Sequence, residues 1–390
     1  MFSDASGVTR FKLAKCLIGF YQLTGMLMIT IPRKAGRELY LIFLGFFYVI
    51  FLIITMSVAL YNFKYLFDTR NPLGLFMDVI QLAVPIGSHI VILVRTFTSR
   101  RFHRKIWELY GKVDRSLRLC DIETGKNIES FLKKYSWKFV ILIVFGCGLE
   151  VVIIFIISPG SSGWRVQRAM AIVPFLGNRL CQLMMMFYSE FHREFLTIIV
   201  QEFLKLVQDC NDDFATKPIQ QFLLYRKCKC LKDNYNSLWL SVKYINKCFG
   251  LSIFFNIGMN FIILIVDYYW NFKAFYLNSS NSRLASSLCS VPLVAVLLPF
   301  IQSCDNTLRP LREVKSSLGK MKLHRENKYL NRLIKQFSLE VLQHEIELEA
   351  SRFFSINYEL LQGFISAMSI YLVIFIQFEL ADNYTYTVPM

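Results

Sequence analysis

Long runs of apolar residues recur along the chain, separated by segments rich in polar and basic side chains. An α-helix needs about 20 predominantly apolar residues to cross the hydrocarbon core of a bilayer. Seven runs are candidates: 39–61, 74–94, 139–157, 170–188, 249–266, 284–304 and 355–378. The first is the clearest because no charged residue lies between Glu38 and Lys64, whereas Asn178 and Arg179 interrupt the fourth. The pattern predicts an all-α, polytopic membrane protein with seven transmembrane helices.

Helical periodicity continues beyond several spans into the polar segments. From Phe187 to Phe203 apolar residues recur three and four positions apart, which predicts that the fourth helix extends to about Cys210. The helical pattern resumes at Ile219 and leads through Lys247 into the fifth span. A further amphipathic stripe precedes the last span and consists of Leu330, Leu333, Ile334, Phe337, Val341 and Leu342. Such stripes usually pack within their own chain, and otherwise they contact another subunit.

The apolar stretch 16–32 follows three basic residues and has some features of a signal peptide or of an eighth span. Polar residues and glycines interrupt it, however, and no cleavage site of small residues follows. We expect an interfacial or re-entrant helix here, before the first crossing.

The composition agrees with a membrane protein, because 54% of the residues are hydrophobic and only 18% are charged. Soluble domains average about 45–50% apolar and about 25% charged residues. A net charge of +16 in a soluble protein would suggest nucleic-acid binding. The basic residues are instead concentrated in alternate segments: 1–38, 95–138, 189–248 and 305–354 hold 37 of them, whereas 62–73, 158–169, 267–283 and 379–390 hold 6. Because basic segments stay in the cytoplasm, we expect a cytoplasmic amino terminus, an extracellular carboxyl terminus and no nucleic-acid partner.

These boundaries divide the chain into five parts. They are a cytoplasmic segment with the interfacial helix (1–38), six spans with cytoplasmic helical extensions at 95–138 and 189–248 (39–304), a cytoplasmic anchor region (305–354), the seventh span (355–378) and an extracellular tail (379–390). The only glycosylation sequons begin at Asn278 and Asn383, and both fall in the predicted extracellular set. The cysteines all lie in cytoplasmic segments or spans, so no extracellular disulfide, metal site or cofactor is predicted.

The last span contains Tyr371, five hydrophobic residues and then Gln377 and Phe378. This run resembles the carboxyl-terminal signature of the insect gustatory receptor family, which is Thr-Tyr, five hydrophobic residues and Gln-Phe. Ile370 departs from the signature, since the family usually has Thr there. The chain length, the seven spans and the inverted orientation are also similar to that family.

The resemblance implies a receptor in the plasma membrane of sensory neurons that acts as a ligand-gated, non-selective cation channel and not as an enzyme. It further implies a homo- or hetero-tetramer and a small-molecule tastant, for which a bitter or other non-sugar compound is the expected class. One alternative is a subunit of the related odorant-receptor-type channels. A polytopic transporter is less favoured, because no clustered histidines or carboxylates and no matching broken spans occur within the membrane.

Under this resemblance the seventh span of each subunit lines a central pore. At about 100° per residue, one face of this helix carries Gln377, Ile374, Val373, Ile370 and Ser366. A ring of Ile or Val side chains closes a pore by dewetting, and a ring of Gln amides replaces part of the hydration shell of an ion. Tyr371 and Phe378 point elsewhere and are expected to pack against neighbouring helices. The competing interpretation is an ordinary helix whose small residues serve packing.

Charged residues inside spans are candidates for a functional site, because they are costly in a bilayer. Glu150 and Arg179 lie at similar depth if the third span runs outward and the fourth runs inward, which predicts an ion pair. The pair either fixes the register of two helices or forms part of the wall of an outward-opening ligand pocket. The other polar residues that we assign to such a pocket are Asp78, Gln81, Asn260 and Asp267.

Overall fold

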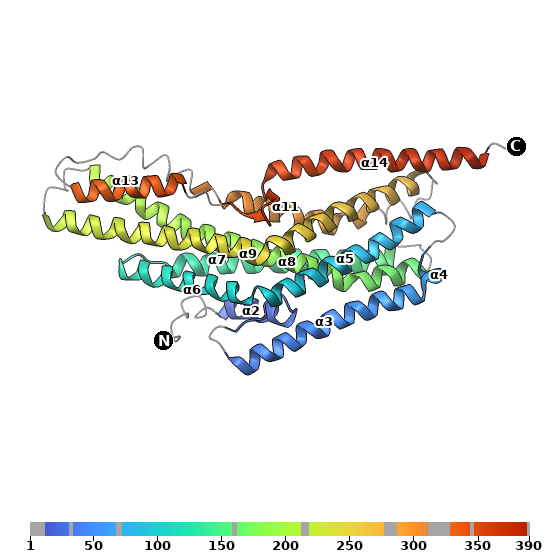
Figure 1. Cartoon of the computed structure of the whole chain (residues 1–390), viewed down its shortest axis with the longest axis horizontal. Helices are drawn as coiled ribbons and strands as arrows, with labels where there is room; N and C mark the ends of the chain where they lie inside the picture. The colour runs from blue at the N-terminus through green and yellow to red at the C-terminus, as the bar shows by residue number, and fades with distance from the viewer. Residues whose placement is uncertain are drawn as a thin grey trace.

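The computed structural model describes residues 12–30, 34–67, 72–157, 162–211, 218–276, 287–307, 309–310, 328–343 and 347–387. These residues form an elongated bundle of helices (Figure 1). The helices are α2 (Lys12–Leu23), α3 (Ala35–Tyr61), α4 (Phe63–Leu66), α5 (Pro72–Thr98), α6 (Arg100–Leu119), α7 (Gly125–Val152), α8 (Ser162–Asn211), α9 (Pro218–Tyr276), α11 (Val291–Asn306), α13 (Lys328–Gln343) and α14 (Tyr358–Thr387). A π-helical turn, Ile153–Ile157, continues α7, and two short strands, β1 (Glu349–Ala350) and β2 (Phe354–Ser355), pair antiparallel before α14.

Within the described residues, seven helices are long and apolar enough to cross a bilayer. They are Ala35–Tyr61, Pro72–Thr98, Gly125–Ile156, Gly163–Leu206, Gln221–Phe275, Ser287–Asn306 and Tyr358–Phe378. Each of them overlaps one of the seven predicted spans, so the prediction of an all-α, seven-helix membrane protein is confirmed. A helix satisfies its own backbone hydrogen bonds, which is why helices can span the bilayer as these seven do.

The helices α8 and α9 continue well beyond the length that a bilayer requires. They contain 50 and 59 residues, whereas a span needs about 20. At the end of the molecule opposite the carboxyl-terminal end of α14, the extended parts lie beside α6 and α13 (Figure 1). The helical extensions predicted from periodicity are therefore present.

The amphipathic helix α13 packs against α9 through most of the predicted stripe. Leu330, Leu333, Ile334, Phe337 and Val341 are buried. Leu342 is 60% exposed, so its assignment to the stripe is wrong. At about 100° per residue the five buried positions fall within an arc of about 100° around the helix axis, whereas Leu342 lies about 130° from the centre of that arc.

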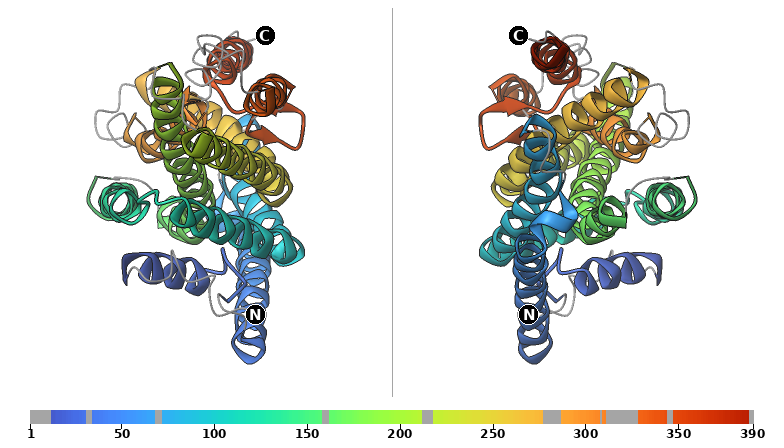
Figure 2. Two further views of the ribbon diagram at one scale, coloured as in Figure 1. Left: turned by 90° about the vertical axis from the view of Figure 1, so that its left-hand side faces the viewer. Right: turned by 90° about the vertical axis from the view of Figure 1, so that its right-hand side faces the viewer.

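The apolar stretch at the amino terminus is helical only as far as Leu23. Gly25 adopts a φ of 74°, which glycine tolerates without steric cost, and the chain turns there. The residues from Met26 to Thr30 are buried but not helical, so the prediction of one helix over 16–32 is wrong in its second half. The helix α2 itself lies crosswise to the long helices, an orientation that suits an interfacial helix (Figure 2).

The last helix begins at the cap provided by Asn357. The Oδ1 atom of Asn357 accepts a hydrogen bond from the backbone N–H of Leu360 at 3.0 Å, as N-cap side chains do. The helix α14 continues to Thr387, beyond the predicted boundary at 378, so much of the predicted tail 379–390 is helical. No glycine or proline occurs between Phe378 and Thr387 to stop the helix.

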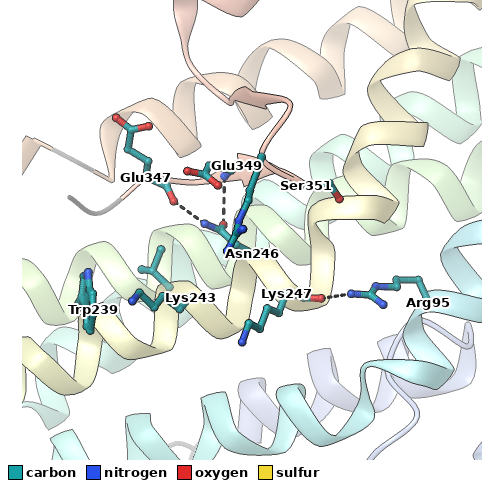
Figure 3. Close-up of a pocket in the computed structure, with 10 residues that line it drawn as sticks. Arg95, Trp239, Lys243, Asn246, Lys247, Glu347, Glu349 and Ser351 are labelled. Carbon is teal, nitrogen blue, oxygen red and sulfur yellow. Dashed lines mark hydrogen bonds between the residues drawn. The ribbon is translucent and has the colours of Figure 1, made fainter. Parts of the chain in front are cut away.

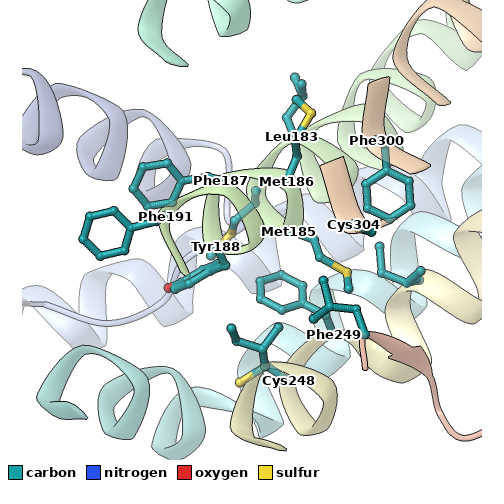
Figure 4. Close-up of a cluster of buried hydrophobic side chains, with 14 of the residues drawn as sticks. Leu183, Met185, Met186, Phe187, Tyr188, Phe191, Cys248, Phe249, Phe300 and Cys304 are labelled. Atoms are coloured by element: carbon teal, nitrogen blue, oxygen red, sulfur yellow. The ribbon is translucent and has the colours of Figure 1, made fainter. Parts of the chain in front are cut away.

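The centre of the bundle is an apolar core around the middle of α8 (Figure 4). Met185, Phe187 and Phe191 are almost fully buried there, and Phe249 of α9 and Phe300 of α11 pack nearby. The indole N–H of Trp107 in α6 donates to the hydroxyl of Tyr188 at 2.9 Å, so the polar tip of this tyrosine is satisfied. The core fixes α8 against its neighbours on several sides.

Candidate functional site

The predicted ion pair between α7 and α8 is present. A guanidinium nitrogen of Arg179 donates to Oε1 of Glu150, and the two side chains are 7% and 15% exposed. The low exposure of both partners places the two charges where an unpaired one would be costly. Their pairing fixes the position of α7 relative to α8.

A second charged group joins α5, α8 and α9. Nη2 of Arg168 lies 2.7 Å from Oδ1 of Asp267, and the amide of Gln81 donates to the same oxygen at 2.9 Å. Beside them, the amide of Gln167 donates to the backbone carbonyl of Asp78 at 2.8 Å. Three of the predicted pocket residues, Asp78, Gln81 and Asp267, therefore lie in one group. Together with Gln167, Arg168 and Trp270 we call it the outer polar cluster, after the side of the membrane that the sequence predicts for it.

The outer polar cluster leaves several buried atoms without a hydrogen-bond partner among the described residues. These atoms are Oε1 of Gln81, Oε1 of Gln167, Nε of Arg168, Oδ2 of Asp267 and Nε1 of Trp270. Buried polar atoms nearly always have a partner in a native protein. Several such atoms lie together in this one group of residues.

Asn260 belongs to a separate polar network and not to the outer polar cluster. Its amide donates to Asn256 at 3.2 Å, and the amide of Asn256 in turn donates to the backbone carbonyl of Asn178 at 2.8 Å. Gln182 and Ser88 complete the network through bonds of 2.6 Å to Asn256 and Asn178. Because these groups satisfy one another, the network is suited to holding α5, α8 and α9 together.

Sequence reasoning misses Arg168, Asn178, Gln182 and Asn256 as parts of these groups. The sequence assigns Arg168 to an extracellular segment, but α8 begins at Ser162 and places this arginine inside the bundle. A signal for the other three is their spacing, since Asn178 and Gln182, like Asn256 and Asn260, stand four residues apart on one helical face.

The helix α14 contacts its own chain along a single stripe. The stripe consists of Leu361, Phe364, Met368, Tyr371 and Phe375. The rings of Phe364 and Tyr371 lie edge-on to the ring of Phe261 in α9, at centroid distances of 5.1 and 5.9 Å. Tyr371 thus contacts α9 on one side, although it is still 48% exposed.

The face of α14 that the sequence assigns to a pore is centred about 155° from this stripe around the helix axis, and its residue nearest to the stripe, Ile374, lies about 60° from Tyr371. Ile370, Val373 and Ile374 are 62%, 52% and 38% exposed, and Ser366 and Gln377 are exposed as well. Phe378 is 62% exposed among the described residues, so the expectation that it packs against a neighbouring helix stays a prediction. The chain itself therefore does not cover this face.

The two predicted glycosylation sites are not described at the level of side chains. Asn278 lies outside the described residues. Asn383 lies in the last part of α14, of which only the backbone is described.

Comparison with known proteins agrees with this architecture. A family model for the 7tm chemosensory receptors matches residues 14–382. The chain is 21% identical over 352 residues to the putative gustatory receptor 2a of Drosophila melanogaster, which covers 81% of each chain. It is 29% identical over 161 residues to gustatory receptor 23a of Drosophila melanogaster, which covers 40% of this chain and 42% of that receptor.

Solved structures with the same fold are also known. The insect olfactory receptor OR5 from Machilis hrabei matches with a TM-score of 0.65 and 12% identity over 95% of this chain and 99% of that one. The complex of that receptor with eugenol matches with a TM-score of 0.62 and 13% identity over 93% and 97% of the two chains. The family match spans nearly the whole chain and confirms the resemblance to insect gustatory receptors. The chain belongs to the 7tm chemosensory receptor family.

Proposed function

We propose that the chain is a subunit of a tetrameric, ligand-gated, non-selective cation channel whose pore is lined by α14. The observation that carries this proposal is the uncovered helix itself. None of the most apolar 18-residue window of α14 is buried inside the chain, although the helix is apolar and long enough to span a membrane. A central position among identical or related subunits gives this helix both the contacts and the water-filled channel that its two faces require.

The residues on the uncovered face suit a gate. Ile370, Val373 and Ile374 form a ring of branched side chains in a tetramer, and such a ring excludes water when it is narrow. Gln377 follows one turn further along, where its amide contacts permeant ions. Ser366 supplies a polar group at the other end of the face.

The outer polar cluster is the proposed ligand site. Arg168 and Asp267 offer an orphaned N–H donor and an orphaned carboxylate acceptor, and a polar tastant satisfies both. Glu150 and Arg179 form the adjoining wall, because Glu150 lies near enough to Arg168 for their charges to interact. Bitter or other non-sugar tastants are the proposed class, and the alternative is an odorant acting on the same channel architecture.

A direct contact connects this site with the pore helix. Phe375 of α14 packs against the small apolar group formed by Met77, Val266 and Tyr269. These residues lie on the same stretches of α5 and α9 as Gln81 and Asp267 of the outer polar cluster. Movement of the cluster on ligand binding therefore reaches α14 one residue away from Ile374.

We further propose that the amino terminus is cytoplasmic and that the receptor acts in the plasma membrane of sensory neurons. The uneven distribution of basic residues supports the orientation. Epitope tags at each end, stained without permeabilising the cells, test it. Staining of an amino-terminal tag, with none at the carboxyl terminus, would contradict the orientation.

Currents evoked by a panel of alkaloids, phenolics and sugars test the function directly. Voltage-clamped cells that express the chain, alone or with other receptor subunits, should conduct cations when a non-sugar tastant is applied. Asp267→Asn should raise the half-maximal ligand concentration by about tenfold, since it removes a buried charge beside the ligand. Asp114→Asn is the matched control, because Asp114 is a buried carboxylate that pairs with Arg118 on α6, far from the site. Surface-expressed chains that give no current with any compound in any subunit combination would contradict the proposal.

A further inference from the structure

The strands β1 and β2 and the turn between them form a hairpin, 349–355, that precedes α14. A cavity of about 570 Å³ opens between this hairpin and the middle of α9, near the end of α5 (Figure 3). Its volume lies in the range of small-ligand clefts, about 300–1,000 Å³. Four basic side chains line it, those of Arg95, Lys243, Lys247 and Arg352, together with the acidic residues Glu347 and Glu349. A cavity lined mainly by charged groups is unlike the apolar surfaces of the spans and requires its own explanation.

The walls of this cavity are fixed by close contacts. The amide of Asn246 donates to the backbone carbonyl of Glu347 at 2.7 Å, and its Oδ1 accepts from the backbone N–H of Glu349 at 3.2 Å (Figure 3). One side chain of α9 thus holds the hairpin by its backbone. At Gly250 the hairpin comes so close that an added Cβ would stand 2.8 Å from the backbone nitrogen of Ser351. Hydrogen bonds and close packing therefore hold the walls of the cavity in place.

The four basic side chains of the cavity form no ion pair with any described carboxylate. Arg95 donates to the backbone carbonyl of Lys247 at 2.6 Å, and its buried Nε has no acceptor. The ammonium of Lys243 lies 3.6 Å from the ring centroid of Trp239. Another lysine of α9 does form an ion pair, because the ammonium of Lys232 lies 3.0 Å from Oε1 of Glu340.

The two acidic residues of the cavity do not neutralise this charge. Glu347 accepts a hydrogen bond from the hydroxyl of Ser355 at 2.7 Å, and its carboxylate points away from α9 (Figure 3). The ammonium of Lys243 lies beside Trp239, and that of Lys247 points away from the hairpin toward α6, 5.8 Å from the ring centroid of Phe102 (Figure 3). The α9 side of the cavity therefore carries positive charge that no described carboxylate pairs with.

We propose that this cavity binds a phosphate monoester anion, the group shared by the headgroups of phosphorylated inositol lipids and by soluble inositol phosphates. An Arg with free N–H groups and two Lys side chains supply the charge-assisted donors that phosphate oxygens accept. Basic pockets between helices at the cytoplasmic membrane surface bind such headgroups. In the proposed orientation the cavity lies at the cytoplasmic ends of α5 and the fifth span.

At this position the bound anion directly contacts the segment that determines where α14 begins. Arg352 lies at the turn of the hairpin, and α14 begins six residues later at Tyr358. Ser351 and Arg352 both have positive φ values, 52° and 65°, so the turn has a conformation that side-chain-bearing residues rarely adopt. A phosphate bridging Lys243 and Arg352 would tie this turn to α9.

Binding by the purified, full-length receptor tests the proposal without reference to ion conduction. One probe is a nanodisc of phosphatidylcholine with or without phosphatidylinositol bisphosphate, and the other is soluble inositol trisphosphate. The double variant Lys243→Gln/Lys247→Gln should bind the preferred probe about tenfold or more weakly, since each basic residue near the surface contributes to the attraction. The matched control Lys112→Gln/Lys229→Gln removes the same charge from two exposed lysines outside the cavity and should change the affinity by less than about twofold.

Arg352→Gln is a second variant, because it changes an exposed side chain and leaves the contacts of Asn246 intact. It should also weaken binding while the elution volume and thermal midpoint of the receptor stay unchanged. Weaker binding confined to the lipid nanodiscs identifies a lipid headgroup as the source, and weaker binding of both probes identifies the phosphate group alone. Equal affinity of Arg352→Gln, the lysine double variant and the control for both probes would overturn the proposal.

Discussion

The two helices α8 and α14 are both long and apolar, but their surroundings within the chain are opposite. In α8, 78% of the most apolar 18-residue window is buried inside the chain, whereas the value for α14 is 0%. The helix α8 contacts α5, α7, α9 and α11, and α14 contacts mainly α9 along one stripe. The same hydrophobicity therefore serves packing within the subunit in α8 and contact with lipid or other subunits in α14.

The contacts of α8 are made within the subunit, whereas the uncovered face of α14 is available for contacts made on assembly. Polar groups in the middle of α8 are satisfied by other helices of its own chain, as the bond from Ser88 to Asn178 illustrates. On the exposed face of α14, the hydroxyl of Ser366 donates within its own helix, to the backbone carbonyl of Gln362 at 3.0 Å. Changes in α8 should therefore affect folding of the subunit, and changes in α14 should affect assembly and conduction.

The largest expected effect is loss of a core aromatic ring. Phe191→Ala in α8 removes a side chain that is 0% exposed and should cost about 3–5 kcal/mol of folding stability. Phe378→Ala in α14 removes a ring that is 62% exposed and should leave the thermal midpoint of the detergent-solubilised monomer nearly unchanged. Fluorescence-detected size exclusion after heating measures both. Equal loss of the monomer peak in the two variants would break the comparison.

Breaking the ion pair of α8 with α7 should have the next largest effect. Arg179→Ala or Glu150→Ala leaves the charge of the other residue unpaired at low exposure. Each change should lower the folding stability by about 3 kcal/mol, the low end of the range for buried pairs, because both side chains keep some exposure. Surface biotinylation should show reduced expression for each single change. Exchanging the two charges by Glu150→Arg/Arg179→Glu should restore part of it, and unchanged surface levels in both single variants would argue against a structural pair.

Acidification should have the smallest effect, and it should act on the α8 side. Burial lowers the pKa of His103 from 6.5 to about 3, and this histidine contacts the hydroxyl of Tyr188 in α8. Because the folded pKa is depressed, the stabilisation is complete above about pH 6.5 and is lost as the pH falls toward 3. The thermal midpoint should therefore fall between about pH 7.5 and 5.5, by a change equivalent to about 1 kcal/mol. His103→Phe should reduce this pH dependence, and an identical slope in the variant would show that other groups cause it.

Features with a regular period along the chain could be predicted from sequence. The spans, the extended helices α8 and α9 and most of the buried face of α13 follow from apolar spacing alone. The ion pair of Glu150 and Arg179 also follows, since depth in a membrane can be counted along two helices. The orientation of Tyr371 relative to Ile374 depends on the same helical geometry.

Features that depend on contacts between distant segments could not be predicted. The strands β1 and β2 have two residues each, too few to show an alternating pattern. The role of Arg168 depends on where α8 begins and on which face of α9 carries Asp267. The hydrogen bond from Asn246 to the backbone of Glu347 likewise joins residues about a hundred positions apart in the chain.

Cysteine accessibility along α14 tests the central claim most directly. Single substitutions to Cys at Ile370, Ile374 and Gln377 on the uncovered face, and at Met368, Tyr371 and Phe375 on the packed stripe, are exposed to a charged thiol reagent while ligand-evoked current is recorded. The reagent should block current at the first three positions and not at the other three, because only the first face meets water in an open pore. Block that is equal on both faces, or confined to the packed stripe, would contradict a pore lined by this face of α14.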